Sequence, residues 1–277
     1  MRLLEVKDLS IENLKTHTKI IDSISFELDS DQCLGIVGES GSGKSMTSKA
    51  ILGLTDPWLK VTGSVKFKNI DLIGSDKNAI GRVRGKQICT ILQDAMSAFD
   101  PLYTIGYQMI ETLTENRNIS NREARKISIM ALERLCIDNA SRVMKKYPHQ
   151  LSGGMLQRCM IAAALVMEPD IIIADEPTTS LDSINQRQVV EIFKQLRQTT
   201  DTAIIFISHD LAVIQQLSQN ILVMKDGRRV EYGNAHKIFK NPENDYIRYL
   251  IDMRLKLSEP FSKSMSSNIS EDDTNVC

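Results

Sequence analysis

Residues 38–45 read Gly38-Glu39-Ser40-Gly41-Ser42-Gly43-Lys44-Ser45, and this stretch decides the fold. It fits the pattern G-x-x-x-x-G-K-[ST], it follows an apolar run from Cys33 to Val37, and it precedes a run from Met46 to Leu54 that we expect to be helical. Glycines let backbone N–H groups turn inward around phosphate oxygens. Lys44 is expected to reach the outer phosphates of a nucleotide and the Ser45 hydroxyl to bind Mg²⁺.

Two further apolar runs end in polar residues. Ile171-Ile172-Ile173-Ala174 leads into Asp175-Glu176, and Ala203 to Ile207 leads into Ser208-His209-Asp210. Continuous apolar runs of this length, separated by helical stretches, are typical of buried parallel strands. Ligands of open α/β sheets bind beyond the carboxyl ends of such strands. We therefore expect an α/β fold in which three segments meet at one site.

The pair Asp175-Glu176 suits the chemistry of that site. Mg²⁺ prefers hard oxygen ligands, so Asp175 opposite Ser45 is expected to help hold the ion, and Glu176 can polarise an attacking water. An acidic strand end that only meets solvent is the alternative interpretation.

The remaining segments have other patterns. Leu3 to Ser10, Ile20 to Leu28 and Gly63 to Asn69 alternate as β-strands do and predict a small antiparallel layer. Residues 97–166 are predicted to form an inserted helical lobe, in which Ser120-Asn121-Arg122-Glu123 has capping-box spacing. We expect one domain over residues 1–257 and a disordered tail over 258–277 that is Ser-rich and acidic.

Composition excludes several classes of protein. The net charge of −1 and the pI near 6.5 offer no basic field for nucleic acid. The five cysteines form no CxxC pair, which favours a reducing cytosol. The first residues are charged too early for a signal peptide, and the apolar runs are far shorter than the roughly 20 residues that span a bilayer. If the protein acts at a membrane, we therefore expect it to do so through a partner protein.

A second helix start follows the lobe, in the stretch Leu151-Ser152-Gly153-Gly154-Met155-Leu156-Gln157-Arg158. Ser152 can cap a helix predicted to run to Glu168, before Pro169, and the two glycines leave its N-terminus bare and attractive to anions. Together with the phosphate loop, this stretch resembles the signature motif of the ATP-binding-cassette (ABC) transporter family.

Other marks of that family occur in its order. Gln93 resembles the loop glutamine that links Mg²⁺ to the helical lobe, and Ser180-Leu181-Asp182 resembles the loop that touches the opposing subunit. His209 matches the histidine that contacts the γ-phosphate. The resemblance covers roughly residues 1–255 and implies a P-loop NTPase cassette with a RecA-like core.

The resemblance also implies function and partners. It assigns catalysis to Glu176 and His209, ATP and Mg²⁺ as cofactors, and Ser45, Gln93 and Asp175 to the metal, in part through water. It implies a head-to-tail dimer in which the phosphate loop of one subunit faces the signature of the other. The implied partners are a second homologous ATPase subunit, two transmembrane permease subunits and an extracellular or periplasmic solute-binding protein, with no nucleic acid. The implied location is peripheral, on the cytoplasmic face of the cell membrane.

One difference from the family concerns the residue that contacts the adenine base. The family places an aromatic residue before its second strand to stack on adenine, whereas this chain has no Phe, Tyr or Trp between Ile11 and Ile20, and His17 is the nearest candidate.

Finer similarities predict the branch of the family and the transported cargo. Residues 97–106 after Gln93 and the stretch Ile238 to Pro242 look like the oligopeptide, dipeptide and nickel importer branch. Residues 139–148 and 154–158 resemble the first ATPase subunit of nickel importers, and after Ile251 the chain has only Cys277, unlike the cysteine-rich extensions of many peptide importers. We expect a transition metal as cargo, with peptide import as the alternative. A soluble ATPase acting on nucleic acid or ribosomes and a catalytically silent cassette fit less well.

Overall fold

A six-stranded sheet holds the polar strand ends together. The computed structural model describes residues 1–68, 70–75, 77–179 and 181–253. The sheet has the order β10-β9-β3-β8-β7-β6. Its strands are β3 (Cys33–Val37), β6 (Ile88–Ile91), β7 (Ile171–Asp175), β8 (Ala203–Ile207), β9 (Asn220–Lys225) and β10 (Arg228–Asn234).

The parallel part of this sheet confirms the prediction made from the apolar runs. β3 pairs with β8 and β8 with β7, all in parallel, and every residue of β3 and β8 is buried. Since both faces of these strands are covered, their apolar runs are continuous rather than alternating. The predicted α/β core is therefore present, with β10 added as an antiparallel edge.

A second sheet of four strands forms the base of the molecule, in the order β2-β1-β4-β5. Its strands are β1 (Arg2–Asn13), β2 (Lys19–Asp29), β4 (Leu59–Phe67) and β5 (Ile70–Asp71), and the pairs are antiparallel. Its buried side chains, such as Val6 and Phe26, pack in one cluster with Ile36 of β3 and with Ile51. The predicted antiparallel layer is confirmed, apart from Asn69, which lies outside the described residues.

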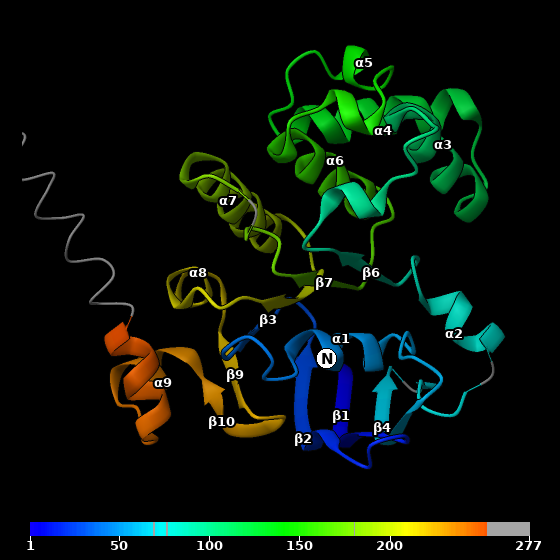
Figure 1. The fold of residues 1–277 in the computed structure, drawn as a ribbon. Coiled ribbons are helices and arrows are strands. Elements are labelled where there is room, and N and C mark those ends of the chain that lie inside the picture. The colour runs from blue at the N-terminus through cyan, green and yellow to red at the C-terminus, as the bar shows by residue number, and fades with distance from the viewer. Residues whose placement is uncertain (69, 76, 180, 254–277) are drawn as a thin grey trace, which may run out of the picture.

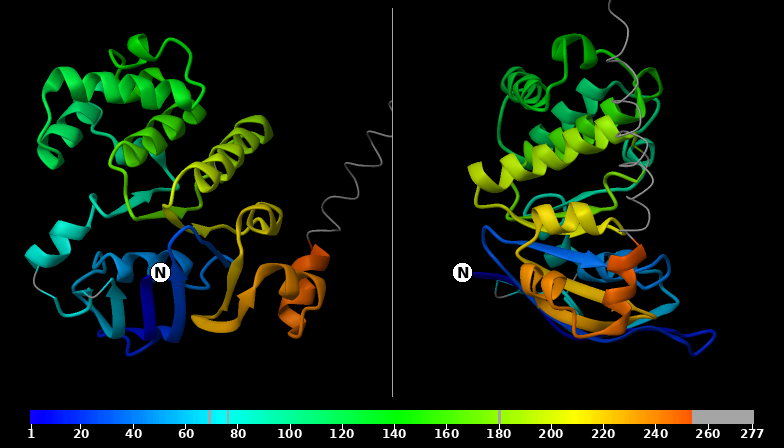
Figure 2. Two further views of the ribbon diagram at one scale, coloured as in Figure 1. Left: turned by 180° about the vertical axis from the view of Figure 1, so that it is seen from behind. Right: turned by 90° about the vertical axis from the view of Figure 1, so that its left-hand side faces the viewer.

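A helical lobe stands on the other side of the six-stranded sheet (Figure 1). It contains the short helix η1 (Ala95–Ala98), α3 (Ile105–Asn116), α4 (Asn121–Arg134), α5 (Ala140–Val143), η2 (Pro148–Gln150) and α6 (Gly153–Leu165). The helices from α3 to α6 fall within the predicted region of residues 97–166, whereas η1 begins two residues before it. The Ser120 hydroxyl caps α4 by accepting the Glu123 N–H at 3.2 Å. The two further views show the lobe and the antiparallel sheet at opposite ends of the molecule (Figure 2).

Two helix lengths differ from the prediction. The helix after Ser152 ends at Leu165 rather than Glu168, because Glu168 has a φ of 51° ahead of Pro169 and cannot continue it. The helix after the phosphate loop, α1 (Lys44–Ile51), begins two residues before Met46 and ends before Leu54. It ends there because the N–H groups of Gly53 and Leu54 bond back to the carbonyls of Ala50 and Lys49.

The other helices are α2 (Lys77–Val83), α7 (Ser183–Thr199), α8 (Leu211–Leu217) and α9 (Ala235–Lys240), and residues 245–253 are also helical. Within the described ranges, no helix is both long and apolar enough to cross a bilayer. The predicted tail over 258–277 lies outside the described residues, so the domain limits stay a prediction.

Candidate active site

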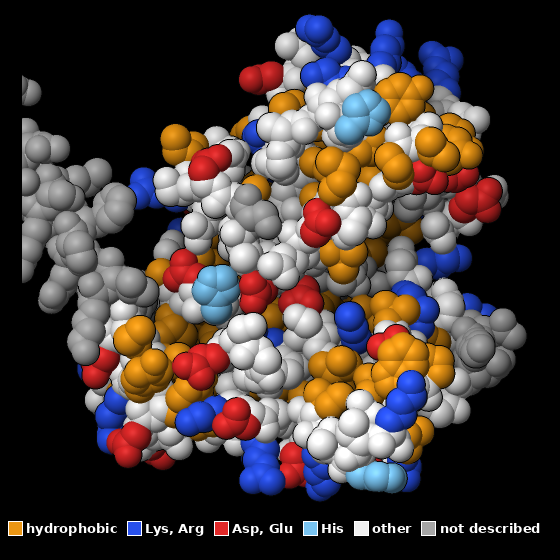
Figure 3. Space-filling model, in the orientation of Figure 1, with side chains coloured by type: hydrophobic (Ala, Val, Ile, Leu, Met, Phe, Trp, Pro, Cys, Tyr) orange, Lys and Arg blue, Asp and Glu red, His pale blue; other side chains and the backbone are white. Residues whose placement is uncertain are grey.

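The strand ends bring the predicted polar residues to one edge of the sheet. Asp175 pairs with Ile207, the last residue of β8, so that Glu176 and His209 follow on neighbouring strands. Ile91 of β6 pairs with Ala174, which places Gln93 just beyond the same edge. Acidic and histidine side chains gather between the helical lobe and the four-stranded sheet (Figure 3).

The phosphate loop connects β3 to α1 and leaves the start of that helix bare. Gly43 occupies the N-cap position with a φ of 99°, a conformation that side chains disfavour, and no side chain caps the helix. A Cβ on Gly43 would also lie 2.3 Å from Ile21 Cδ1. The first N–H groups of α1 therefore point into the loop, where an anion can accept from them.

Two further groups of the loop suit phosphate. The Lys44 side chain is only 5% exposed, and its Nζ donates to the carbonyl oxygens of Gly38 and Glu39, both at 2.8 Å. Burial lowers the Lys44 pKa, whereas the charges of Glu176 and Asp175 oppose that shift. Among the described residues, the buried Ser42 Oγ has no hydrogen-bond partner. A cation and an unsatisfied hydroxyl in one loop fit the phosphates of a nucleotide.

The Ser45 hydroxyl and Asp175 form the expected pair of hard oxygen ligands. Ser45 Oγ donates to Asp175 Oδ1 at 2.9 Å across 130 residues of sequence. Burial, chiefly, raises the pKa of Asp175, and the Glu176 charge adds to the rise, against the Ser45 hydrogen bond and the Lys44 charge. A partly buried carboxylate in need of positive charge, beside a hydroxyl, fits Mg²⁺.

Neighbouring groups hold the Glu176 backbone and side chain in place. It has a φ of 46°, and its N–H donates to Ile207 O at 3.0 Å. Thr179 Oγ1 donates to Glu176 Oε2 at 2.7 Å, and His209 Nδ1 lies 3.3 Å from the same oxygen. A strained backbone that is fixed by neighbouring groups is common at active sites. The sequence interpretation missed Thr179, although its place three residues after Glu176 is a local signal.

The signature residues lie apart from the phosphate loop of their own chain. Ser152 caps α6 by accepting the Met155 N–H at 3.3 Å, and Ser152 and Gly153 are exposed. In the described part of the chain, no hydrogen bond joins Ser152, Gly153 or Gly154 to residues 38–45.

The start of α7 packs against the signature instead. A Cβ on Gly154 would lie 2.7 Å from the Asn185 side chain, whose amide donates to Asp182. Asp182 also caps α7, since its carboxylate accepts the N–H groups of Ile184 and Asn185. Of the predicted loop Ser180-Leu181-Asp182, Ser180 lies outside the described residues.

Two predicted residues are exposed. Gln93 is exposed in the bend between β6 and η1. His17 lies in the turn between β1 and β2, where its side chain is 79% exposed and its Nδ1 is 3.5 Å from Glu12 Oε1. The structure thus places a histidine, rather than a Phe, Tyr or Trp, ahead of β2.

The raised Asp175 pKa predicts a stability effect. When the pKa of a carboxyl group is higher in the folded than in the unfolded state, its ionisation lowers the free energy of unfolding at pH values above that pKa. For Asp175 this destabilisation vanishes below the ordinary pKa of 3.8. Asp175→Asn keeps an oxygen that accepts from Ser45. We therefore expect the nucleotide-free variant to melt at a higher temperature than wild type at pH 7, with a gain that disappears toward pH 4. Calorimetry across this range, with the exposed Asp252→Asn as control, measures it. A lower Tm at pH 7 contradicts the expectation.

Comparisons with known proteins agree with this geometry. A family model described as ABC transporter matches residues 21–179. The chain is 40% identical to the metal-staphylopine import system ATP-binding protein CntD of Staphylococcus aureus, over 97% of this chain and 99% of that protein. It is 42% identical to the dipeptide transport ATP-binding protein DppD of Bacillus subtilis, over 88% of this chain and 76% of that protein.

Solved structures show the same cassette. The dimeric, post-hydrolysis structure of the ATP-binding cassette MJ0796 bound to ADP and Pi superposes with a TM-score of 0.75 and 26% identity, over 84% of this chain and 99% of that chain. CbiO1 from Clostridium perfringens, part of the transporter complex CbiONQ, has a TM-score of 0.73 and 27% identity, over 95% of this chain and 99% of that chain. The chain belongs to the ABC transporter family, as an ATP-hydrolysing transport subunit of the oligopeptide, dipeptide and nickel importer branch.

Proposed function

We propose that this subunit powers the import of a transition metal, either nickel or a metal held by a small chelator. The observation that carries the proposal is the extent of the match to the metal-staphylopine ATPase, which spans 97% of this chain and 99% of that protein at 40% identity. The resemblance of residues 139–158 to nickel-importer subunits supports the same cargo.

Peptide import is the second candidate. Dipeptide and oligopeptide ATPases match at 42% and 39% identity, so identity alone does not separate the two cargoes. Their matches cover 76% and 73% of those proteins, however, compared with 99% for the metal-staphylopine relative. The extent of the match favours the metal.

The site residues take the following proposed roles. The loop Gly38 to Ser45 binds the phosphates of ATP, with Lys44 at the β- and γ-phosphates. Ser45 and Asp175 hold Mg²⁺, and Gln93 reaches it through water. The ion, when bound, neutralises charge on the phosphates. The support for these roles is the unpartnered Ser42 Oγ and the Ser45–Asp175 pair.

Glu176 is proposed to orient and deprotonate the attacking water, and His209 to contact the γ-phosphate. The two side chains already lie 3.3 Å apart, and the Thr179 hydroxyl donates to the same carboxylate oxygen. A carboxylate positioned in this way acts as a general base.

As an ABC transport ATPase, the chain dimerises and works with transmembrane permeases. We propose that its partners are a second homologous ATPase, two permeases and a solute-binding protein, and that it works at the cytoplasmic face of the membrane. Hydrophobic side chains gather on the helical lobe (Figure 3). The exposed ones include Leu92, Met96, Leu102, Tyr103, Tyr107 and Tyr147, which supports a protein contact there.

The pairing with a second ATPase predicts the behaviour of the lone chain. Because the proposed partner is a different ATPase chain, whose signature helix each active site needs, we expect the isolated subunit to be mostly monomeric and a poor ATPase. Co-expression with the second ATPase is expected to raise turnover per chain. Sedimentation and phosphate release, each measured over a range of protein concentrations, test this. High turnover of the lone chain that does not depend on its concentration contradicts the proposed partner.

The cargo is tested by deleting the gene. Cellular nickel, cobalt and zinc are measured by mass spectrometry, beside growth on peptides as the sole amino-acid source. We expect metal content to fall and peptide growth to persist, with recovery on complementation by wild type but not by Lys44→Ala. Unchanged metal content with lost peptide growth favours the peptide importer and leaves the ATPase assignment intact.

A further inference from the structure

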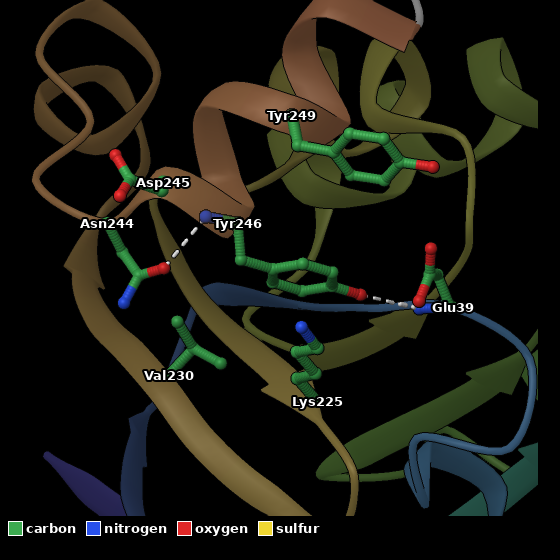
Figure 4. Close-up of a pocket in the computed structure, with 7 residues that line it drawn as sticks. All are labelled: Glu39, Lys225, Val230, Asn244, Asp245, Tyr246 and Tyr249. Carbon is green, nitrogen blue, oxygen red and sulfur yellow. Dashed lines mark hydrogen bonds between the residues drawn. The ribbon is translucent and has the colours of Figure 1, made fainter.

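The helical segment 245–253 reaches back to the phosphate loop. The Tyr246 hydroxyl accepts a hydrogen bond from the Glu39 backbone N–H at 3.1 Å, across 207 residues of sequence. Glu39 is the second residue of the loop, and Tyr246 is only 8% exposed. Figure 4 shows this bond with the tyrosine ring pointing toward the loop.

Tyr246 and Lys44 both form hydrogen bonds to the peptide unit between Gly38 and Glu39. The peptide bond between Gly38 and Glu39 carries the Gly38 carbonyl at one end and the Glu39 N–H at the other. Lys44 Nζ donates to that carbonyl at 2.8 Å, while the N–H donates to Tyr246. One peptide plane is therefore fixed at both ends, and hydrogen bonds arranged in a chain polarise one another.

Tyr246 itself is held in place. Asn244 Oδ1 accepts the Tyr246 backbone N–H at 2.8 Å, and Lys225 Nζ lies 4.8 Å from the centre of the ring. Burial, chiefly, raises the pKa of Tyr246, so its hydroxyl is neutral at physiological pH.

A cavity of about 700 Å³ lies beside this contact. Glu39, Lys225, Tyr246 and Tyr249 are among its lining residues. Residues of the segment and Glu39 of the loop both line this space, and the Tyr246 hydroxyl joins the two (Figure 4).

We propose that Tyr246 is a positioning residue for nucleotide binding. Its hydroxyl orients the Gly38–Glu39 peptide and thereby keeps the loop in the shape that phosphates enter. Without it, the loop must be ordered when the nucleotide binds, which weakens affinity without altering the bound, reacting state. The inference rests on the proposed role of residues 38–45 in holding the phosphates.

Tyr246→Phe tests the inference, because it removes only the hydroxyl. The dissociation constant for Mg-ADP is measured by titration calorimetry on the full chain, and KM and kcat for ATP on the complex with its partner subunits. We expect both the dissociation constant and KM to rise roughly three- to tenfold, the range that a neutral hydrogen bond spans, with kcat unchanged.

Tyr232→Phe is the matched control. The Tyr232 hydroxyl also accepts a glutamate backbone N–H, from Glu27 at 3.3 Å, but it does so between β10 and β2, away from the phosphate loop. Tyr246→Phe loses the hydrogen bond to Glu39, and Tyr232→Phe loses two to Glu27, because the Tyr232 hydroxyl also donates to Glu27 O at 3.1 Å. Both variants are therefore expected to lower Tm. Only Tyr246→Phe is expected to change nucleotide affinity.

The outcomes separate this inference from the proposed function. Nucleotide affinity within twofold of wild type for Tyr246→Phe, an equal loss in both variants, or a fall in kcat with KM unchanged overturns the positioning role. Lys44→Ala is titrated in parallel. If wild type binds Mg-ADP and Lys44→Ala binds it equally well, the assignment of the loop to phosphate fails instead, and the inference falls with it.

Discussion

Glu176→Gln is expected to abolish ATP turnover while ATP binding persists. The amide has the shape of the carboxylate and can still accept from Thr179 Oγ1, which lies 2.7 Å from Glu176 Oε2. It cannot take a proton from water, and a general base contributes about 10²- to 10⁴-fold to the rate. We therefore expect kcat to fall by at least about a hundredfold, with the dissociation constant for ATP within about threefold of wild type.

The measurement is phosphate release by the complex with its partner subunits, beside nucleotide titration of the same variant. Glu191→Gln on α7 is the control, since Glu191 is an exposed carboxylate on the surface of the cassette. Turnover of Glu176→Gln near the wild-type rate would refute the proposed role of Glu176.

Lys44→Ala is expected to act on binding itself. The buried ammonium now rests on two backbone carbonyls at 2.8 Å, which phosphate oxygens can replace as partners. Hydrogen bonds to charged groups contribute about 1.5–3 kcal/mol each. Losing those that Lys44 would donate to the phosphates is therefore expected to weaken ATP binding by roughly a hundredfold or more. Removing the cation also leaves the carboxylates of Asp175 and Glu176 without its charge.

Lys49→Ala is the matched control for this variant, because Lys49 lies on the same helix but is exposed. Titration with ATP and with Mg-ADP compares the two, and circular dichroism checks that both variants are folded. An affinity of Lys44→Ala within threefold of wild type would mean that other groups hold the phosphates.

Together with Tyr246→Phe, these two variants divide the site into parts. Lys44 is expected to govern affinity, Glu176 the rate at saturation, and Tyr246 affinity alone and by a smaller factor. The start of α7 connects these parts to the rest of the cassette. Asn185 touches Gly154 of the signature, and Gln186 Nε2 donates to Asp210 Oδ2 at 3.1 Å, next to His209.

Much of the fold followed from local sequence patterns. The apolar runs ending at Val37, Ala174 and Ile207 predicted parallel strands, and the structure places them side by side. Period and burial are properties of a few consecutive residues, so a sequence reveals them directly. The helix ends were less predictable, since α6 stops at Leu165, where the backbone ahead of Pro169 turns out of the helical region.

The sequence by itself determined which residues we propose for the chemistry, namely the phosphate loop, the Asp175-Glu176 pair and His209, because each is a short motif with a chemical requirement. Only the tertiary structure decided how they are held. It brings Ser45 to Asp175 across 130 residues, keeps Gly154 against Asn185 and joins Tyr246 to Glu39. These contacts depend on how strands and helices pack, and a hydroxyl or amide far along the chain has no local pattern that identifies its partner.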